Sequence, residues 1–322
     1  MKKTRKIGNS NLGTYPFVLG GNVFGWTANE KASFEILDTY VDAGFNFIDT
    51  ADIYSVWVKG HNGGESEAII GNWLKKNGKR DNVMISTKVG GEMSDSKKGL
   101  KKEYIIKAVE DSLKRLNTDY IDLYFTHYDD LSTPIEETLE AYASLIAAGK
   151  IRYIGASNMS SARIRESLEV SKVNSLPAYI CLQPQYNLYE REGYEKDYEP
   201  LAEKYDLGVI CYYSLASGFL TGKYKSVADL KDSQRGGDIE KYLNDRGMRI
   251  INELQSIADQ YNATCAQIAL AWLQATPSIT APIASASNNV QLSDILKSID
   301  IDLDEKARRR LDTASSYKMI QI

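Results

Sequence analysis

The sequence predicts an α/β fold of the (β/α)8 or TIM barrel class, and two observations support this prediction. Short apolar segments of strand length alternate with amphipathic segments of helix length along the chain. This alternation favours a parallel sheet, because each strand must be connected to the next through a helix. The apolar segments number eight, which is the number of strands in a closed barrel of this class.

The eight predicted strands are short apolar runs bounded by glycine or polar residues. They cover residues 16–20, 45–49, 82–87, 120–127, 151–156, 179–183, 208–212 and 279–283. The helices predicted between and after them cover residues 30–43, 64–77, 103–116, 133–148, 160–173, 193–205, 264–275 and 289–298. For the helix 133–148 we expect a capping box, with Thr133 as the cap, Pro134 at the first helical position and Glu136 completing the box.

Three segments fit no strand–helix repeat. Residues 246–261 and 304–315 predict additional helices, and residues 214–245 predict a charged, glycine-bearing loop after the seventh strand. A loop of this length is normally either functional or disordered. No linker or internal repeat divides the chain, so residues 1–322 are predicted to form one domain.

Composition argues against several kinds of binding partner and indicates where the protein is located. The net charge is −4 and no basic stripe is present, which argues against a nucleic-acid partner. No apolar run approaches the ~20 residues of a membrane span, and the basic N-terminus lacks the apolar core of a signal peptide. We therefore expect a cytoplasmic protein without a membrane partner. Its three cysteines, Cys181, Cys211 and Cys265, are far apart, and no metal site is expected. The oligomeric state stays open.

Four residues of complementary chemistry follow the second, third and fourth predicted strands. They are Asp49, Tyr54, Lys88 and His127. The carboxyl ends of all strands in a barrel face one way, so these side chains are expected to meet in one pocket. Taken singly, each is more often a cap, a surface charge or a packed side chain. Their joint placement favours a site.

This set of groups is suited to protonating an oxygen. An ammonium at ~4 Å stabilises a phenolate by roughly 4 kcal/mol at an effective dielectric of about 20, so we expect Lys88 to lower the Tyr54 pKa toward neutral pH. Asp49 would keep Lys88 charged, and neutral His127 would donate a hydrogen bond to the substrate oxygen. Such a site can protonate the alkoxide that forms when hydride adds to a carbonyl. The other histidine, His61, lies in a polar run and is predicted to be an exposed loop residue.

Over essentially its whole length the chain resembles the aldo-keto reductase family. The segments that carry the resemblance are AGFNFIDTADIY (43–54), ISTKVG (85–90), IDLYFTHYDD (121–130), GASNMS (155–160), LQPQYNLYERE (182–192) and YYSLASGFLTGKY (212–224). The resemblance identifies the four residues as a catalytic tetrad, with Tyr54 as the proton donor. It implies an oxidoreductase that reduces an aldehyde, ketone or sugar-type carbonyl to an alcohol. The family binds a nicotinamide dinucleotide without a Rossmann domain, and the chain contains no GxGxxG.

The resemblance also implies a set of cofactor contacts. Ser157, Asn158 and Gln183 would hydrogen-bond the nicotinamide carboxamide, although a helix N-cap is the simpler role for Ser157 and Asn158. Tyr212 would stack on the ring, or Tyr213 if the strand register slips by one residue. The other expected contacts are Leu215, Ser217, Gly218 and Lys223 at the pyrophosphate and Ser285, Ala286, Ser287 and Gln291 at the adenosine end.

The adenosine end departs from the family pattern. Gln291 stands where many members have the arginine that binds the 2′-phosphate, so a charge-assisted bidentate contact is missing. Lys225 and Arg235 in the long loop could supply charge instead, or could be solvated loop residues. The resemblance favours NADP(H), and NAD(H) is the alternative.

The sequence leaves open the role of four aromatic residues near the site, and it allows two activities other than carbonyl reduction. Phe24, Trp26, Trp57 and Tyr128 flank strand ends and would form an aromatic wall, or simply pack. A cofactor-free lyase or aldolase could use Lys88 as a Schiff base, but a lysine paired with an aspartate stays protonated. A cofactor-sensing barrel like the potassium-channel β subunits is the other alternative, and the intact tetrad argues against it.

Overall fold

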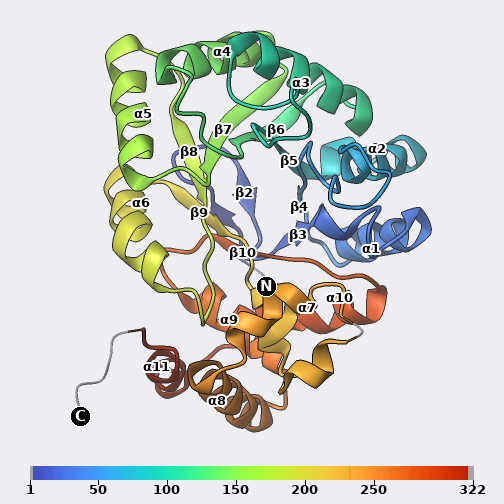
Figure 1. The fold of residues 1–322 in the computed structure, drawn as a ribbon, viewed down its shortest axis with the longest axis vertical. Helices are drawn as coiled ribbons and strands as arrows, with labels where there is room; N and C mark the ends of the chain where they lie inside the picture. The colour runs from blue at the N-terminus through green and yellow to red at the C-terminus, as the bar shows by residue number, and fades with distance from the viewer. Residues whose placement is uncertain (1–2, 232, 318–322) are drawn as a thin grey trace.

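The computed structural model describes residues 3–231 and 233–317, which fold around a closed barrel of eight parallel strands (Figure 1). The strands are β3 (Val18–Gly20), β4 (Phe47–Asp49), β5 (Met84–Val89), β6 (Ile121–Thr126), β7 (Ile151–Ser157), β8 (Tyr179–Gln183), β9 (Gly208–Cys211) and β10 (Ala281–Ala284). They follow one another around the barrel in chain order, and β10 pairs with β3 to close it. The predicted barrel class is therefore confirmed.

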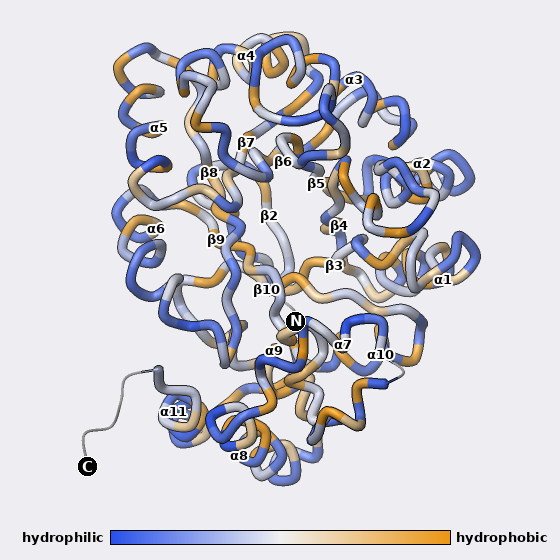
Figure 2. Tube along the Cα trace, viewed as in Figure 1, coloured by the Kyte–Doolittle hydropathy of each residue, from blue (hydrophilic) through white to orange (hydrophobic). Residues whose placement is uncertain are grey.

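Helices surround the barrel and occupy the predicted intervals (Figure 1). They are α1 (Glu30–Asp42), α2 (Glu65–Asn77), α3 (Lys102–Leu116), α4 (Ile135–Ala147), α5 (Ser161–Asn174), α6 (Glu199–Tyr205), α9 (Cys265–Ala275) and α10 (Asn289–Leu296). The two additional predicted helices are α8 (Asp245–Tyr261) and α11 (Glu305–Ala314), which pack against each other. Hydrophobic and hydrophilic residues alternate along the turns of these helices (Figure 2), so each helix can bury one face and expose the other. Within the described residues, no helix has the length and apolarity needed to cross a membrane.

The long loop after β9 contains short helices. They are η4 (Ala216–Thr221), η5 (Val227–Leu230), α7 (Gly236–Ile239) and η6 (Glu240–Tyr242). The remaining short elements are η1 (Gly21–Val23), η2 (Arg80–Asn82), a π-helix η3 (Tyr194–Tyr198) and η7 (Lys297–Asp300). Leu230, Ile239 and Tyr242 are buried, so apolar side chains anchor this loop to the barrel.

An N-terminal hairpin, which the sequence pattern did not predict, adds to the barrel interior. It pairs β1 (Arg5–Lys6) with β2 (Gly13–Thr14). Ile7 and Leu12 from its turn pack with inward-facing strand residues such as Phe47 and Phe125. Gly8 in this turn has φ +49°, and a Cβ there would lie 2.1 Å from the Ile180 carbonyl oxygen. Only glycine fits so close an approach of two backbones.

The predicted capping box of α4 is wrong. Pro134 is the N-cap residue, and no side chain caps the helix. The Thr133 hydroxyl instead donates to Asp130 Oδ2 at 2.6 Å. A carboxylate is the stronger acceptor, so the threonine is used in the preceding loop.

Candidate active site

Three of the four candidate catalytic residues lie at the carboxyl ends of neighbouring strands. Asp49 ends β4, Lys88 lies in β5, and His127 directly follows β6. Tyr54 comes from the loop between β4 and α2, and its ring centroid lies 6.0 Å from that of His127. The structure therefore brings all four side chains together at one end of the barrel.

Lys88 is the centre of this cluster and is fully buried. Its Nζ donates to Asp49 Oδ2 at 2.7 Å, to the Thr50 carbonyl oxygen at 2.6 Å and to the Tyr54 hydroxyl at 3.3 Å. Burial is the largest single effect and lowers the Lys88 pKa, but the charges and hydrogen bonds of Asp49 and Tyr54 together outweigh it, and the pKa is raised. The ammonium stays charged, which argues against a Schiff-base role.

Asp49 is held by further donors. Ser86 Oγ donates to Asp49 Oδ1 at 2.7 Å, and Gln183 Nε2 donates to the same oxygen at 2.9 Å. Parallel pairing of β4 with β5 sets Asp49 opposite Ser86. The carboxylate thus has its oxygens satisfied and is fixed in position, as a buried charge requires.

The pKa of Tyr54 differs from our expectation. Burial raises it above the ordinary value of 10.0, and the opposing effect of Lys88 is smaller. The prediction of a Tyr54 pKa near neutral is therefore wrong, because the phenol is removed from water more completely than a strand-end position suggests. Burial, followed by the charge of Lys88, lowers the pKa of His127 well below 6.5. His127 is accordingly neutral at physiological pH.

The three residues expected at the nicotinamide lie beside this cluster. Ser157 Oγ donates to the Gln183 carbonyl oxygen at 2.8 Å, and Asn158 Nδ2 donates to the His127 carbonyl oxygen at 2.8 Å. Neither residue caps α5, whose N-cap is Ser160. The Tyr212 hydroxyl donates to Asn158 Oδ1 at 2.9 Å. Tyr213 also lines the cavity, so the geometry leaves both tyrosines available.

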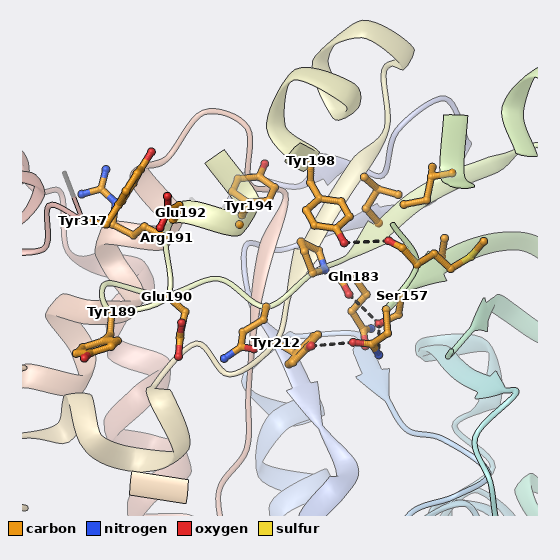
Figure 3. A pocket seen from close by; sticks show the side chains of 18 of the residues that line it. Ser157, Gln183, Tyr189, Glu190, Arg191, Glu192, Tyr194, Tyr198, Tyr212 and Tyr317 are labelled. Carbon is orange, nitrogen blue, oxygen red and sulfur yellow. Dashed lines mark hydrogen bonds between the residues drawn. The ribbon is translucent and has the colours of Figure 1, made fainter. Parts of the chain in front are cut away.

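A cavity of about 1200 Å³ extends from the cluster across the carboxyl end of the barrel. Eleven of the twelve expected cofactor residues line it: Ser157, Asn158, Gln183, Tyr212, Leu215, Ser217, Gly218, Lys223, Ser285, Ser287 and Gln291. The twelfth, Ala286, is buried instead. Figure 3 views a second cavity, of about 560 Å³, which shares Ser157, Gln183 and Tyr212 with the first.

Polar residues in the loop after β3, which sequence reasoning missed, also line the cavity. The Ser285 hydroxyl donates to Asn22 Oδ1 at 2.5 Å, and Thr27 and Ser287 share a hydrogen bond of 2.9 Å. Asn22 and Thr27 lie in the loop that follows the first barrel strand, and a polar residue after a strand end is the signal that could have found them. Gln291 Oε1 accepts from the Ser287 backbone N–H at 2.9 Å.

The aromatic wall is partly as predicted. Trp26, Trp57 and Tyr128 line the cavity. Phe24 is fully buried in the hydrophobic core, so its expected place in the wall is wrong. Of the two loop cations considered for the cofactor, Arg235 lines the cavity, whereas Lys225 is an exposed residue outside its lining.

The residues of the cavity fit a nicotinamide dinucleotide. Its volume lies above the range of ordinary small-ligand pockets. Its lining carries amide and hydroxyl groups and Lys223, and it includes the turn at Ser217 and Gly218, where φ is +56° and +99°. A turn of this kind presents backbone N–H groups to an anion.

The fold and the polar site together define an α/β barrel with its candidate functional residues at the carboxyl ends of the strands. The sequence profile of the Aldo/keto reductase family matches residues 16–316, and the chain belongs to this family of oxidoreductases.

Curated relatives agree with this assignment. The chain is 34% identical over 314 residues to the "Uncharacterized oxidoreductase YrpG" of Bacillus subtilis, covering 95% of this chain and 94% of the relative. It is 32% identical to the "Aldo-keto reductase YhdN" of the same organism, and the match covers 94% of this chain and 89% of the relative. It is also 33% identical to a "Probable voltage-gated potassium channel subunit beta" of Arabidopsis thaliana, and the match covers 92% of this chain and 91% of the relative.

Proposed function

We propose that this protein is an NAD(P)H-dependent reductase that converts an aldehyde, ketone or sugar-type carbonyl to an alcohol. The observation that carries the proposal is the hydrogen bond between Lys88 Nζ and the Tyr54 hydroxyl, in a cluster at one end of a cavity of about 1200 Å³. The bound nicotinamide would supply the hydride. The residues of this chain would bind the carbonyl oxygen and provide its proton.

Tyr54 is suited to donate that proton. Its raised pKa keeps the phenol protonated at neutral pH, and an alkoxide is a much stronger base than a phenolate. The positive charge of Lys88 then stabilises the phenolate that remains. At 3.3 Å this attraction is about 5 kcal/mol for an effective dielectric of about 20.

His127 would orient the substrate oxygen. A neutral imidazole carries one N–H that it can donate, and it adds no second positive charge beside Lys88. Its Nδ1 is buried and has no hydrogen-bond partner within the described residues. The ring therefore has an unpaired polar atom, and its centroid lies 6.0 Å from that of the proposed proton donor.

The cofactor would lie along the rest of the cavity. Ser157, Asn158 and Gln183 would hold the carboxamide, and binding would shift the present hydrogen bond between Tyr212 and Asn158. Lys223 and the adjoining turn would take the pyrophosphate. The family resemblance favours NADP(H) over NAD(H) as the preferred dinucleotide.

The test has two parts. A fluorescence titration with NADPH and separately with NADH is expected to show micromolar binding of at least one dinucleotide. Tyr54→Phe is then expected to retain that binding but to lose at least ~10²-fold in turnover, the scale of general acid catalysis. Tyr120→Phe, whose hydroxyl contacts Asp81 away from the cavity, is the matched control. Full activity in Tyr54→Phe would show that the proton donor is another group.

A second candidate function follows from the Arabidopsis relative. A protein named as a potassium channel β subunit suggests a barrel that binds the cofactor chiefly for regulation. The buried ion pair of Lys88 and Asp49, with Tyr54 within hydrogen-bond reach, favours catalysis. Turnover separates the two: a sensor would bind the dinucleotide tightly and oxidise it at most once per molecule over a wide carbonyl panel.

A further inference from the structure

We propose that Glu65 is a positioning residue, whose carboxylate holds the loop between β4 and α2 so that the Tyr54 hydroxyl stays at Lys88. This inference rests on the reductase function proposed above and adds a residue that acts on the proton donor from outside the cavity. Glu65 is the first residue of α2 and is partly buried, and within the described residues it is not part of the cavity lining.

The Glu65 carboxylate binds two backbone N–H groups of this loop. Glu65 Oε2 accepts from the Ser55 N–H at 3.2 Å, and Oε1 accepts from the Asn62 N–H at 2.8 Å. One side chain thus holds both ends of the segment 55–62, and each of its oxygens is used. Hydrogen bonds to an ionised carboxylate are stronger than those between neutral groups. The carboxylate therefore restrains the segment more firmly than a neutral side chain would.

The first of these N–H groups belongs to the peptide group that follows Tyr54. The Tyr54 carbonyl oxygen, which is the other polar atom of that peptide group, accepts from the Gly64 N–H at 2.9 Å. Residues at the start of α2 therefore hold both polar atoms of one planar unit. This unit is attached directly to the Tyr54 Cα, so fixing its plane restricts the directions in which the phenol can point.

The start of α2 is itself fixed to the strand end that holds Lys88. Ser66, the neighbour of Glu65, is fully buried, and its Oγ accepts from the Thr50 hydroxyl at 2.8 Å. The Thr50 carbonyl oxygen accepts from Lys88 Nζ at 2.6 Å. Glu65 can therefore fix Tyr54 relative to Lys88, and not only relative to its own helix.

The contact between Tyr54 and Lys88 is sensitive to small displacements. At 3.3 Å it is already longer than most hydrogen bonds in proteins, so a slight shift of the phenol would break it. Trp57, which lies in the segment 55–62, packs edge-on against the Tyr54 ring at 5.8 Å. Without Glu65, both the backbone after Tyr54 and this ring would be less restrained. A misplacement of ~1 Å near a reacting group can lower the rate about 10²-fold.

A second contact crosses the same segment but does not hold the Tyr54 backbone. His61 Nδ1 lies 3.2 Å from the Ser55 hydroxyl and 4.0 Å from Glu65 Oε2. The hydrogen bond between Ser55 and His61 joins two side chains. Its loss leaves both N–H contacts of Glu65 in place, so His61 offers a comparison within the same loop.

The variants separate the carboxylate contacts from other effects of losing a glutamate. Glu65→Ala removes both acceptors, and Glu65→Gln keeps the length of the side chain but offers one acceptor oxygen instead of two. Glu103→Ala is the matched control, because Glu103 is an exposed glutamate in the first turn of α3. It loses the same favourable interaction with a helix dipole. His61→Ala removes only the side-chain contact.

Two measurements are made on each variant. A fluorescence titration with the dinucleotide that the wild type binds gives the dissociation constant and the concentration of binding sites. Rapid mixing of the loaded protein with saturating 4-nitrobenzaldehyde, a reactive aldehyde, then gives the rate of a single turnover per binding site. A role of Glu65 in folding alone would reduce the number of binding sites and leave this rate unchanged.

We expect Glu65→Ala to lower the single-turnover rate per site by about tenfold or more, as a small displacement of the proton donor requires. Its dissociation constant for the dinucleotide should equal that of the wild type. Glu65→Gln should recover part of the rate, because one of the two N–H contacts can be kept. Glu103→Ala and His61→Ala should keep the wild-type rate.

Two results would overturn the inference while the reductase function stands. One is a wild-type rate in Glu65→Ala, and the other is an equal loss of rate in His61→Ala. If the wild type reduces no aldehyde, the reductase proposal fails, and crystal structures of the wild type and Glu65→Ala decide the inference alone. Loss of the hydrogen bond between Lys88 and Tyr54 in the variant would support the positioning role, and an unmoved Tyr54 would refute it.

Discussion

Replacing the buried Asp52 with asparagine is expected to stabilise the fold at neutral pH but not in acid. Asp52 lies in the loop between Asp49 and Tyr54 and is fully buried. Within the described residues neither of its carboxyl oxygens has a hydrogen-bond partner, and the nearby hydroxyls of Tyr104 and Tyr124 also lack one. An ionised carboxylate in such a place is costly.

The electrostatic surroundings of Asp52 agree with this view. Burial first, and then the buried carboxylate of Glu67, raise the Asp52 pKa well above 3.8, while Arg115, the Ile53 backbone and Lys88 act in the opposite direction without cancelling the rise. Arg115 already donates to Glu67 Oε2 at 2.7 Å, and the Thr87 hydroxyl donates to Glu67 Oε1 at 2.5 Å. The available donors thus belong to Glu67, and Asp52 keeps its proton.

The sign of the pH dependence follows from this raised pKa. As the pH rises above 3.8, Asp52 ionises in the unfolded chain but stays protonated in the folded one. The folded state then binds more protons, so the free energy of unfolding falls by up to ~1.4 kcal/mol per pH unit until the folded pKa is reached. Asparagine has no proton to lose, so Asp52→Asn avoids this decrease.

The assay is urea unfolding of the wild type and Asp52→Asn at several values between about pH 4 and pH 8, followed by circular dichroism. Asp95→Asn, an exposed loop substitution, controls for the general effect of losing a carboxylate. The advantage of Asp52→Asn should be smallest at the acidic end and grow with pH. A difference that does not vary with pH would refute the argument. A variant that becomes less stable as the pH rises would show that Asp52 is ionised and paired with Arg115.

Two further predictions concern the site itself. Gln291→Arg should raise the ratio of NADPH affinity to NADH affinity by about tenfold, since it restores a charge-assisted contact to a 2′-phosphate. Titration of both dinucleotides measures this ratio, and the exposed Val290→Arg is the control. An unchanged ratio would place the 2′-phosphate contact elsewhere. The low pKa of His127 means that it stays neutral as the pH falls through 6.5. His127→Gln should therefore leave the shape of the pH profile of kcat/KM unchanged, and an inflection near 6.5 that this variant abolishes would contradict the assignment.

Much of the barrel could be predicted because its signals are local. Each strand is an apolar run and each helix has an amphipathic pattern, so element type follows from spacing alone. Parallel strands in a closed barrel then bring their carboxyl ends together, which placed Asp49, Lys88 and His127 on one face without any knowledge of tertiary contacts. Tyr54 was predicted as a site residue because it lies in the same sequence motif as Asp49, AGFNFIDTADIY.

The features that could not be predicted depend on distant neighbours. The N-terminal hairpin has strands of two residues each, and Ile7 and Leu12 are buried only because the barrel interior meets them. Phe24 and Trp26 are both aromatic residues after β3, yet Phe24 enters the core and Trp26 lines the cavity. Thr133 fits a cap by its spacing, but Asp130 offers its hydroxyl a stronger acceptor.

The pKa of Tyr54 shows how such a distant effect changes a mechanism. Coulomb attraction from Lys88 was the local expectation, and it is present, but removal of the phenol from water outweighs it. The resting tyrosine is therefore a protonated phenol and not a phenolate. In the proposed reaction Lys88 would contribute when the proton leaves, since its attraction of about 5 kcal/mol at 3.3 Å would act on the phenolate that forms. A charge that favours the product of proton transfer more than the resting state is what lowers the barrier. By this reasoning, Lys88 would assist catalysis without first ionising Tyr54.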